Sequence, residues 1–419
     1  MSELKIWDWD AKEKQITDIN EWKGKFEAVY EFTVSDDGEA ISAPVQTEDN
    51  RFTPCLNGKI WDNTFEKVWS LKFSPDGKLT CLVMEEDEWT VAVDDTIWEE
   101  KFEYVWNKEF SPDGKSIAVN IKKENEYGVS LNGKTWENKF VEARDVYVSP
   151  DGSIAASCVQ LKGLAEGDIF GFLEGIWTVA VNGKPWDKKF LNVWGIAFSS
   201  DSKKVAAEVR VDSCEYTIAL DGTVWNETFK CVWEPIFKPL SSDVVAPVQT
   251  DKGWNLAMNG EPIWERNFNQ VWNQIYSPDG QRLAADVAPA FGKWTVAVDG
   301  SPWRKTYNEA VLKPVFSPDS KKVAAIVKEN NRWTVAVDGI PWEEDFDMIW
   351  DPVFSPHSNK VAAKAERNGR FAIVIDGKVG RQEFEALWNP VFSQDGTKLL
   401  IKCIKDGKYY RRIVQLSEI

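Results

Sequence analysis

This sequence of 419 residues has a single histidine and no closely spaced pair of cysteines. His357 is its one histidine, and it stands in a predicted turn where related segments carry aspartate. None of the six cysteines forms a Cys-x-x-Cys pair or has the spacing of a zinc or iron–sulfur site. A single histidine also excludes bis-histidine haem. We therefore expect no metal and no cofactor.

Long hydrophobic runs are missing as well. No apolar run approaches the roughly 18 residues that a membrane-spanning helix needs. The first residues, Met1–Lys5, lead into a tryptophan-rich segment without the apolar centre of a secretory signal. The net charge of −17 argues against nucleic acid or an anionic membrane surface as the main partner. The sequence predicts a soluble, cytoplasmic protein without a membrane span.

The sequence also lacks the common catalytic motifs. It contains no Gly-x-Ser-x-Gly, no phosphate-binding loop, no Gly-x-Gly-x-x-Gly, no His-Glu-x-x-His and no Cys–His pair. Adjacent carboxylates such as Glu99-Glu100 and Glu343-Glu344 point to opposite sides of an extended segment. We therefore predict that the protein is not an enzyme. The alternative left open is a glycosidase-like pair of carboxylates contributed by different repeats.

What the sequence has is a repeat, written most clearly between Trp333 and Ala363. Alternating residues led by Trp333 predict a strand, and Asp338-Gly339 predicts a tight turn. A Ser-Pro-Asp-Gly turn, or a degenerate form of it, recurs ten times, which is the composition of a type I turn. These turns begin at Ser35, Ser74, Ser111, Ser149, Ser199, Lys238, Ser277, Ser317, Ser355 and Ser393.

The spacing of these turns is 37 to 40 residues, with one gap of 50. This period of short strands predicts an all-β fold, a β-propeller of about ten four-stranded, WD40-like blades. We expect residues 1–419 to form a single array in which the strand-like Leu4–Trp9 and an outer segment through Phe26 complete a blade with Tyr409–Leu416. Two five-bladed propellers are the alternative, because ten blades exceed the usual number.

Tryptophan is unusually abundant, and 21 of the 23 tryptophans occupy three positions of the repeat. A residue that recurs at one position in every blade is predicted to hold blades together, rather than to form an aromatic cage or an electron-hopping chain. Nine of them open the outer Trp-x-x-x-Phe/Tyr segment: Trp22, Trp61, Trp98, Trp136, Trp186, Trp225, Trp264, Trp303 and Trp342.

Function is expected where the repeat departs from itself. The largest departure is the insertion Leu161–Gly175, between the second and third strands of one copy. It carries four apolar residues in a glycine-rich loop: Ile169, Phe170, Phe172 and Leu173. Two interpretations stay open, a loop that folds back over its own blade and a hydrophobic docking finger.

Two arginines mark further departures. Arg144 replaces the tryptophan that precedes the inner strand in other copies, and Gly380-Arg381 replaces an outer tryptophan. Arg381 lies in the stretch 360–412, which has twelve Lys/Arg against six Asp/Glu. Such a stretch is either a solvated face or a surface that steers an acidic partner. Both arginines are candidates for contact with a partner.

The chain resembles WD40-like propeller repeats of the PD40 and TolB type over nearly its whole length. The N-terminal IWDWDAKEKQITD, the WTVAVDGxPW units, the VQ…GDIFGF insertion and the closing DPVFSP…KVAAK…WNPVFS are similar to TmcD, the tryptophan-rich subunit of the Tmc transmembrane redox complex of sulfate-reducing bacteria. This resemblance implies an accessory subunit of an electron-transfer complex, peripheral at the inner face of the cytoplasmic membrane. Its partners would be the cytochrome and iron–sulfur subunits, which hold the cofactors.

The sequence therefore predicts a non-catalytic scaffold that acts through protein–protein interaction in a membrane-associated electron-transfer complex. The alternatives are a propeller hydrolase with carboxylates in its channel and a sensor of a small ligand.

Overall fold

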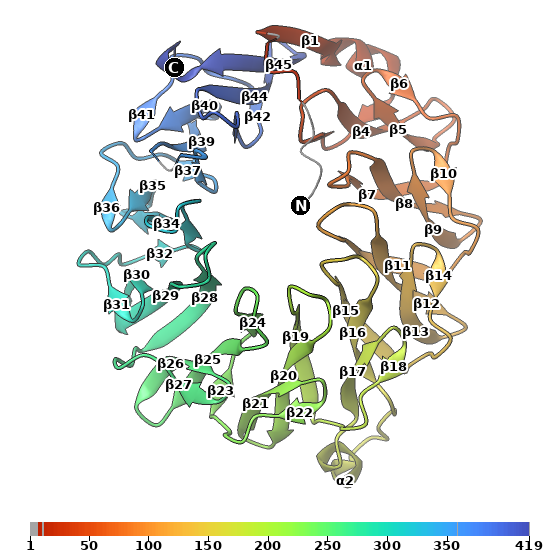
Figure 1. Ribbon diagram of the computed structural model, residues 1–419. Coiled ribbons are helices and arrows are strands. Elements are labelled where there is room, and N and C mark those ends of the chain that lie inside the picture. The colour runs from red at the N-terminus through yellow and green to blue at the C-terminus, as the bar shows by residue number, and fades with distance from the viewer. Residues whose placement is uncertain (1–6, 11, 358, 419) are drawn as a thin grey trace. The chain divides into compact units, whose positions relative to one another are not determined.

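The computed structural model describes residues 7–10, 12–357 and 359–418. It is a β-propeller of ten four-stranded antiparallel sheets, each a meander that runs from an inner to an outer strand (Figure 1). The prediction of about ten four-stranded blades is confirmed. The contacts divide the chain into two compact units.

The first unit comprises Asp49–Thr53 and Trp61–Trp264 and holds five sheets. Their strands are β7 (Lys67–Phe73), β8 (Leu79–Glu85), β9 (Glu88–Val93) and β10 (Thr96–Ile97); β11 (Tyr104–Phe110), β12 (Ile117–Lys123), β13 (Glu126–Leu131) and β14 (Lys134–Thr135); β15 (Glu142–Val148), β16 (Ala155–Gln160), β17 (Trp177–Val181) and β18 (Lys184–Pro185); β19 (Asn192–Phe198), β20 (Val205–Asp212), β21 (Glu215–Leu220) and β22 (Thr223–Val224); β23 (Cys231–Val232), β24 (Ile236–Phe237), β25 (Val244–Thr250), β26 (Gly253–Met258) and β27 (Glu261–Pro262).

The second unit holds the other sheets, apart from the first residues of β5. Their strands are β2 (Ala28–Val29), β3 (Thr33–Val34), β4 (Ile41–Gln46), β5 (Phe52–Leu56) and β6 (Lys59–Ile60); β28 (Gln270–Tyr276), β29 (Leu283–Ala290), β30 (Lys293–Val298) and β31 (Ser301–Pro302); β32 (Ala310–Val311), β33 (Val315–Phe316), β34 (Val323–Glu329), β35 (Arg332–Val337) and β36 (Ile340–Pro341); β37 (Met348–Ile349), β38 (Val353–Phe354), β39 (Val361–Arg367), β40 (Arg370–Ile375) and β41 (Lys378–Val379); β42 (Ala386–Leu387), β43 (Val391–Phe392), β44 (Lys398–Lys405), β45 (Lys408–Gln415) and β1 (Glu13–Asp18).

The Asp-Gly and Asn-Gly turns fix the register of the second, third and outer strands. Asp338 and Gly339 both have positive φ angles, 48° and 81°, as a tight two-residue hairpin requires. The Asp338 carboxylate also accepts a hydrogen bond of 2.9 Å from the backbone N–H of Val323, where the second strand begins. The same contact recurs in other sheets through Asn57, Asp94, Asn132, Asn182, Asp221, Asn259, Asp299 and Asp376.

The Ser-Pro-Asp-Gly turns close on themselves. The Ser317 hydroxyl donates to the Asp319 carboxylate at 2.6 Å and accepts from the Lys322 N–H at 2.9 Å. In a sister turn, hydrogen bonds from Ser393 and Thr397 lower the pKa of Asp395 to about 2. The carboxylates of these aspartates accept hydrogen bonds from the serine hydroxyl and from a backbone N–H of the same turn, so they stabilise the turn.

Tryptophan and glycine form a recurring contact between neighbouring sheets, which we call the tryptophan latch. Trp342 follows the outer strand β36, and its ring lies against Gly377 in the turn of the next sheet. A Cβ on Gly377 would lie 3.0 Å from that side chain, so only glycine fits there without displacement. The same contact occurs in Trp22–Gly58, Trp98–Gly133, Trp136–Gly183, Trp186–Gly222, Trp225–Gly260 and Trp303–Gly339. The outer tryptophans therefore pack blade on blade.

The N-terminal segment differs from its prediction. Residues 7–9 form no strand, and residues 4–6 of the predicted strand lie outside the described residues. The outer strand of the last sheet is instead β1, which pairs antiparallel with β45, as Figure 1 shows. The outer segment that follows is helical, α1 (Ile19–Lys25), because Asp18 caps it by accepting from the Asn20 N–H. Trp22 still reaches its latch position from this helix.

Alanine at Gly339 should lower the melting temperature more than alanine at Gly292. Both glycines have positive φ angles, so each substitution costs roughly 1–2 kcal/mol of backbone strain. Only the Gly339 methyl group meets an indole, 3.0 Å from Trp303, whereas Gly292 has nothing within 4 Å. We expect this overpacking to add about 1–3 kcal/mol. Equal losses in thermal unfolding would contradict the latch.

Candidate functional site

The insertion predicted from the sequence projects from the blade of β15–β18. It connects β16 to β17 and contains a short helix, α2 (Ile169–Leu173), which Figure 1 shows standing away from the sheet. Asp168 starts this helix by accepting a hydrogen bond of 2.8 Å from the Gly171 N–H. The helix exposes Ile169, Phe170 and Leu173, and the Phe170 side chain is 82% exposed.

The base of the insertion is fixed to its own blade. The Leu161 N–H donates to the Ile176 carbonyl at 2.8 Å, and the Ile176 N–H donates to Phe190 at 3.0 Å. Gly175 has a φ of 81°, and a Cβ there would lie 2.9 Å from the Phe190 backbone. The base of the loop packs on its own blade, Phe172 is half-buried, and the helix presents its other apolar residues to solvent. The docking finger stays a prediction.

Arg144 lies in the same sheet as the insertion. Its guanidinium stacks on the Trp177 ring at 3.8 Å, and its Nε lies 2.8 Å from the Glu142 carboxylate. In sister blades an aromatic pair fills this place, such as Trp233 and Trp254 stacked at 5.7 Å. A cation–π contact therefore replaces an aromatic pair, because arginine is flat and wide enough to cover the indole.

A pocket of about 450 Å³ adjoins Arg144. Trp106 and Tyr127 line it with Val141, and the Val141 side chain approaches Gly163 at the base of the insertion. Trp106 also continues a row of aromatic rings, Trp89–Tyr104–Trp106–Tyr127, with successive centroids 5.7–5.9 Å apart. Tyr104 in this row is exposed. The insertion, Arg144 and this aromatic row form one surface, which we call the blade-4 surface.

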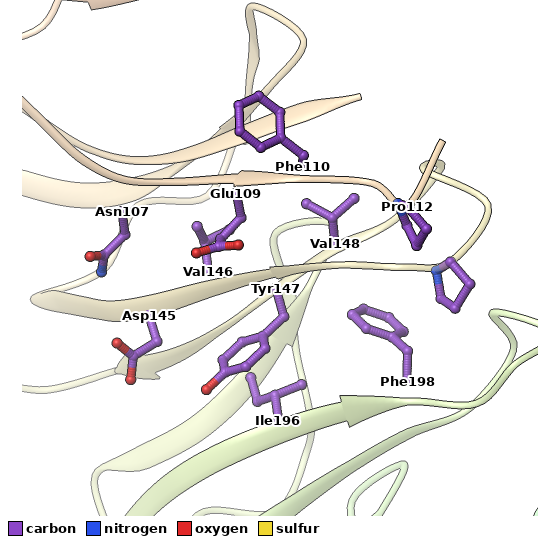
Figure 2. A pocket seen from close by; sticks show the side chains of 11 residues that line it. Asn107, Glu109, Phe110, Pro112, Asp145, Val146, Tyr147, Val148, Ile196 and Phe198 are labelled. Atoms are coloured by element: carbon purple, nitrogen blue, oxygen red, sulfur yellow. The ribbon is translucent and has the colours of Figure 1, made fainter. Parts of the chain in front are cut away.

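A second pocket of about 480 Å³ lies between the inner strands β11, β15 and β19 (Figure 2). Its polar residues include Glu109 from β11 and Asp145 and Tyr147 from β15, and its floor is apolar. Asp145 lines both pockets. Burial, with the charge of Asp145 as a further cause, raises the pKa of Tyr147, so this phenol stays protonated.

Two further carboxylates lie close together in this unit. Burial and the charge of Glu234 raise the pKa of Glu208 to about 8. Gly195 makes room for Glu234, since a Cβ there would lie 2.5 Å from the Glu234 side chain. Glu208 stands on β20 at a repeat position that varies between blades. Two sister strands carry Leu82 and Ile326 there, and others carry polar residues: Asn120, Asp286, Lys364 and Lys402. Sequence reasoning missed Glu208, Glu109 and Tyr147. Polar residues are common at the Glu208 position of the repeat, so Glu208 gave no signal there.

Arg381 belongs to the other compact unit, where it lines a separate pocket of about 230 Å³. The predicted site residues therefore fall into two groups. The residues of the insertion and Arg144 share a blade, and Arg381 belongs to the other compact unit.

The described residues show no group of three His, Cys, Asp or Glu side chains that could hold a metal ion. The six cysteines are free thiols, and burial raises the pKa of Cys81 to about 12, which leaves it a poor nucleophile. Among the helices in the described ranges, none has the length and apolar character to cross a bilayer.

The sequence matches no protein-family profile and no curated protein. Solved structures are similar at low identity. The crystal structure of a eukaryotic initiation factor has 12% identity and a TM-score of 0.47, covering 90% of this chain and 97% of that one. The β-propeller domain of Myceliophteria thermophila Cps50 (Swd1) has 12% identity and a TM-score of 0.30, covering 64% and 94%. Neither likeness bears on activity or partners.

Glutamine at Glu208 should make stability less dependent on pH. The folded protein holds the Glu208 proton up to about pH 8, whereas the unfolded chain releases it near 4.5. Folding stability therefore falls as pH rises through this window, by about 1.4 kcal/mol per unit of pKa elevation at most. We expect wild type and Glu208→Gln to melt alike at pH 5 and the variant to melt higher at pH 8.5. If the melting temperatures of wild type and variant differ by the same amount at pH 5 and at pH 8.5, Glu208 is ionised in the folded protein.

Proposed function

We propose that the protein is a non-catalytic propeller scaffold that docks a partner protein on the blade-4 surface. The observation that supports this proposal most is the exposed apolar helix α2. A solvent-exposed phenylalanine beside an exposed isoleucine and leucine loses hydrophobic free energy unless another surface covers it. The anchored base of the insertion holds these side chains in place before binding, which reduces the entropy lost on docking.

The charges around α2 indicate the chemistry of the partner. Glu166, Asp168 and Glu174 flank the apolar residues, and the whole chain carries a net charge of −17. An apolar groove with a basic rim would complement this helix. The resemblance to TmcD suggests that the groove belongs to a cytochrome or iron–sulfur subunit of a membrane electron-transfer complex. The scaffold would then sit at the cytoplasmic face of that membrane.

Aspartate at Phe170 should abolish docking without loss of fold. The change puts a charge at the centre of the apolar contact, and a hot-spot aromatic contributes about 2 kcal/mol or more. The matched control is Phe291→Asp, since Phe291 is also an exposed aromatic at 95%. Tagged variants are used for affinity capture from detergent-solubilised native cells, with mass spectrometry of the captured subunits.

Capture of a membrane cytochrome and an iron–sulfur subunit by wild type and by Phe291→Asp, with at least tenfold less by Phe170→Asp, is the expected pattern. Equal capture by all three would place docking elsewhere than on α2. Capture of soluble metabolic enzymes alone would contradict the redox-complex assignment.

A second candidate is a hydrolase that uses the pocket between β11, β15 and β19. It is favoured by Glu109 and Asp145, two carboxylates from different blades at one pocket of about 480 Å³. Glycosidases need such a pair at a fixed separation across the scissile bond.

Under the scaffold proposal the purified protein has no turnover on panels of glycosides and peptides. The control is the double variant Glu109→Gln/Asp145→Asn, which should give the same background as wild type. Turnover by wild type that falls by at least 100-fold in the double variant would favour the hydrolase instead.

A further inference from the structure

The position of Gly380 is where the tryptophan latch is interrupted. The Gly380 N–H donates to the Ile373 carbonyl at 2.8 Å, as the Trp342 N–H donates to the Val335 carbonyl at 2.8 Å one blade earlier. The two residues thus hold equivalent places after their outer strands. Trp342 carries an indole that packs on the next sheet, and Gly380 carries no side chain.

The residues that would surround this missing indole line the pocket of about 230 Å³. Around Trp342, the core includes Val335 and Phe346 from its own blade and Ala363 and Val374 from the next. The strand registers place Ile373, Phe384, Ile401 and Arg412 at the equivalent positions, and all four line the pocket. The pocket is therefore the latch position without its tryptophan.

The structure of the last sheet explains why no tryptophan fills the pocket at Gly380. Its third strand, β45, runs into a short 3₁₀ helix, η1 (Leu416–Glu418), because the outer strand comes from β1. The described residues that follow β45, Leu416–Glu418, form η1 and include no turn glycine to receive an indole. Val414 and Glu418 border the pocket instead.

The residue after the outer tryptophan differs in charge between copies. It is acidic in six copies (Asp62, Glu99, Glu137, Asp187, Glu265 and Glu343), and the other three carry Lys23, Asn226 and Arg304. Arg381 takes that position after Gly380, it is exposed, and within the described residues it makes no hydrogen bond or ion pair. Arg412 is already engaged, with its Nε 2.8 Å from Glu13 and its guanidinium over Phe384. Arg381 is therefore the cation available to a ligand.

We propose that this pocket binds the indole ring of a tryptophan in an acidic segment of a partner protein, with an adjacent carboxylate on Arg381. The indole is assigned because tryptophan fills the equivalent place at the other latches, and the acidic neighbour is assigned from the unpaired arginine at the rim. This site is separate from α2, so this proposal does not depend on the docking proposed for the blade-4 surface.

The test uses a labelled peptide with the sequence of residues 340–346, Ile-Pro-Trp-Glu-Glu-Asp-Phe, which is a latch segment of this chain. Binding to the full-length protein is measured by fluorescence anisotropy, with an alanine-for-tryptophan peptide as the matched control. The informative variant is Gly380→Trp, which places an indole of the chain itself in the pocket. Gly380 is not among the glycines with positive φ, and sister copies carry tryptophan there, so this variant should fold.

We expect the tryptophan peptide to bind wild type at least tenfold more tightly than the alanine peptide does. Gly380→Trp should weaken binding at least tenfold and raise the melting temperature. Arg381→Glu, an exposed change that leaves the fold intact, should weaken it about fivefold, and Glu418→Gln should strengthen it. Equal affinity of the two peptides, or undiminished binding by both Gly380→Trp and Arg381→Glu, would overturn the proposal.

Discussion

The contact on which the fold depends is an indole ring laid against a glycine of the next sheet. A four-stranded sheet cannot cover both of its own faces, so each blade is stable only against its neighbours. The tryptophan that follows one outer strand and the glycine in the next Asp-Gly turn supply this contact at the blade periphery. Fully buried alanines such as Ala324 and Ala362 supply it nearer the inner strands, where sheets approach most closely. The same turn therefore serves hairpin geometry and packing between blades.

Repetition distinguishes structural residues from candidate functional residues. Positions that repeat are engaged within the fold: the turn aspartates hold backbone N–H groups, and the outer tryptophans hold the next sheet. Positions that break the repeat are the ones with unused binding capacity. The α2 insertion exposes apolar side chains, and Gly380-Arg381 leaves an open pocket beside an unpaired arginine. The buried Glu208 stands at a repeat position whose residue varies between blades, and burial is the main cause that raises the pKa of its carboxyl to about 8.

The sequence predicted the blades because their signals are local. Asp338-Gly339 and Ser-Pro-Asp-Gly specify turns without help from distant residues. The strand predicted at Leu4–Trp9 was wrong in its described residues, Trp7–Trp9. The helix at Ile19–Lys25 was not predicted, since it depends on the Asp18 cap and on where β45 lies. The pockets beside Glu109 and Gly380 could not be predicted from the sequence either. Each combines residues from separate blades, and a single sequence does not state which side chains of neighbouring strands converge.

Hydrogen–deuterium exchange tests most directly whether the departures from the repeat, rather than the repeat itself, carry the binding. Exchange of backbone amides is compared between the free protein and the protein assembled with its captured membrane partners. Slower exchange in the segment 161–175, with little change in the Ser-Pro-Asp-Gly turns, is the predicted result. Unchanged exchange in 161–175 together with protection of the repeated turns would contradict the assignment of function to the α2 insertion.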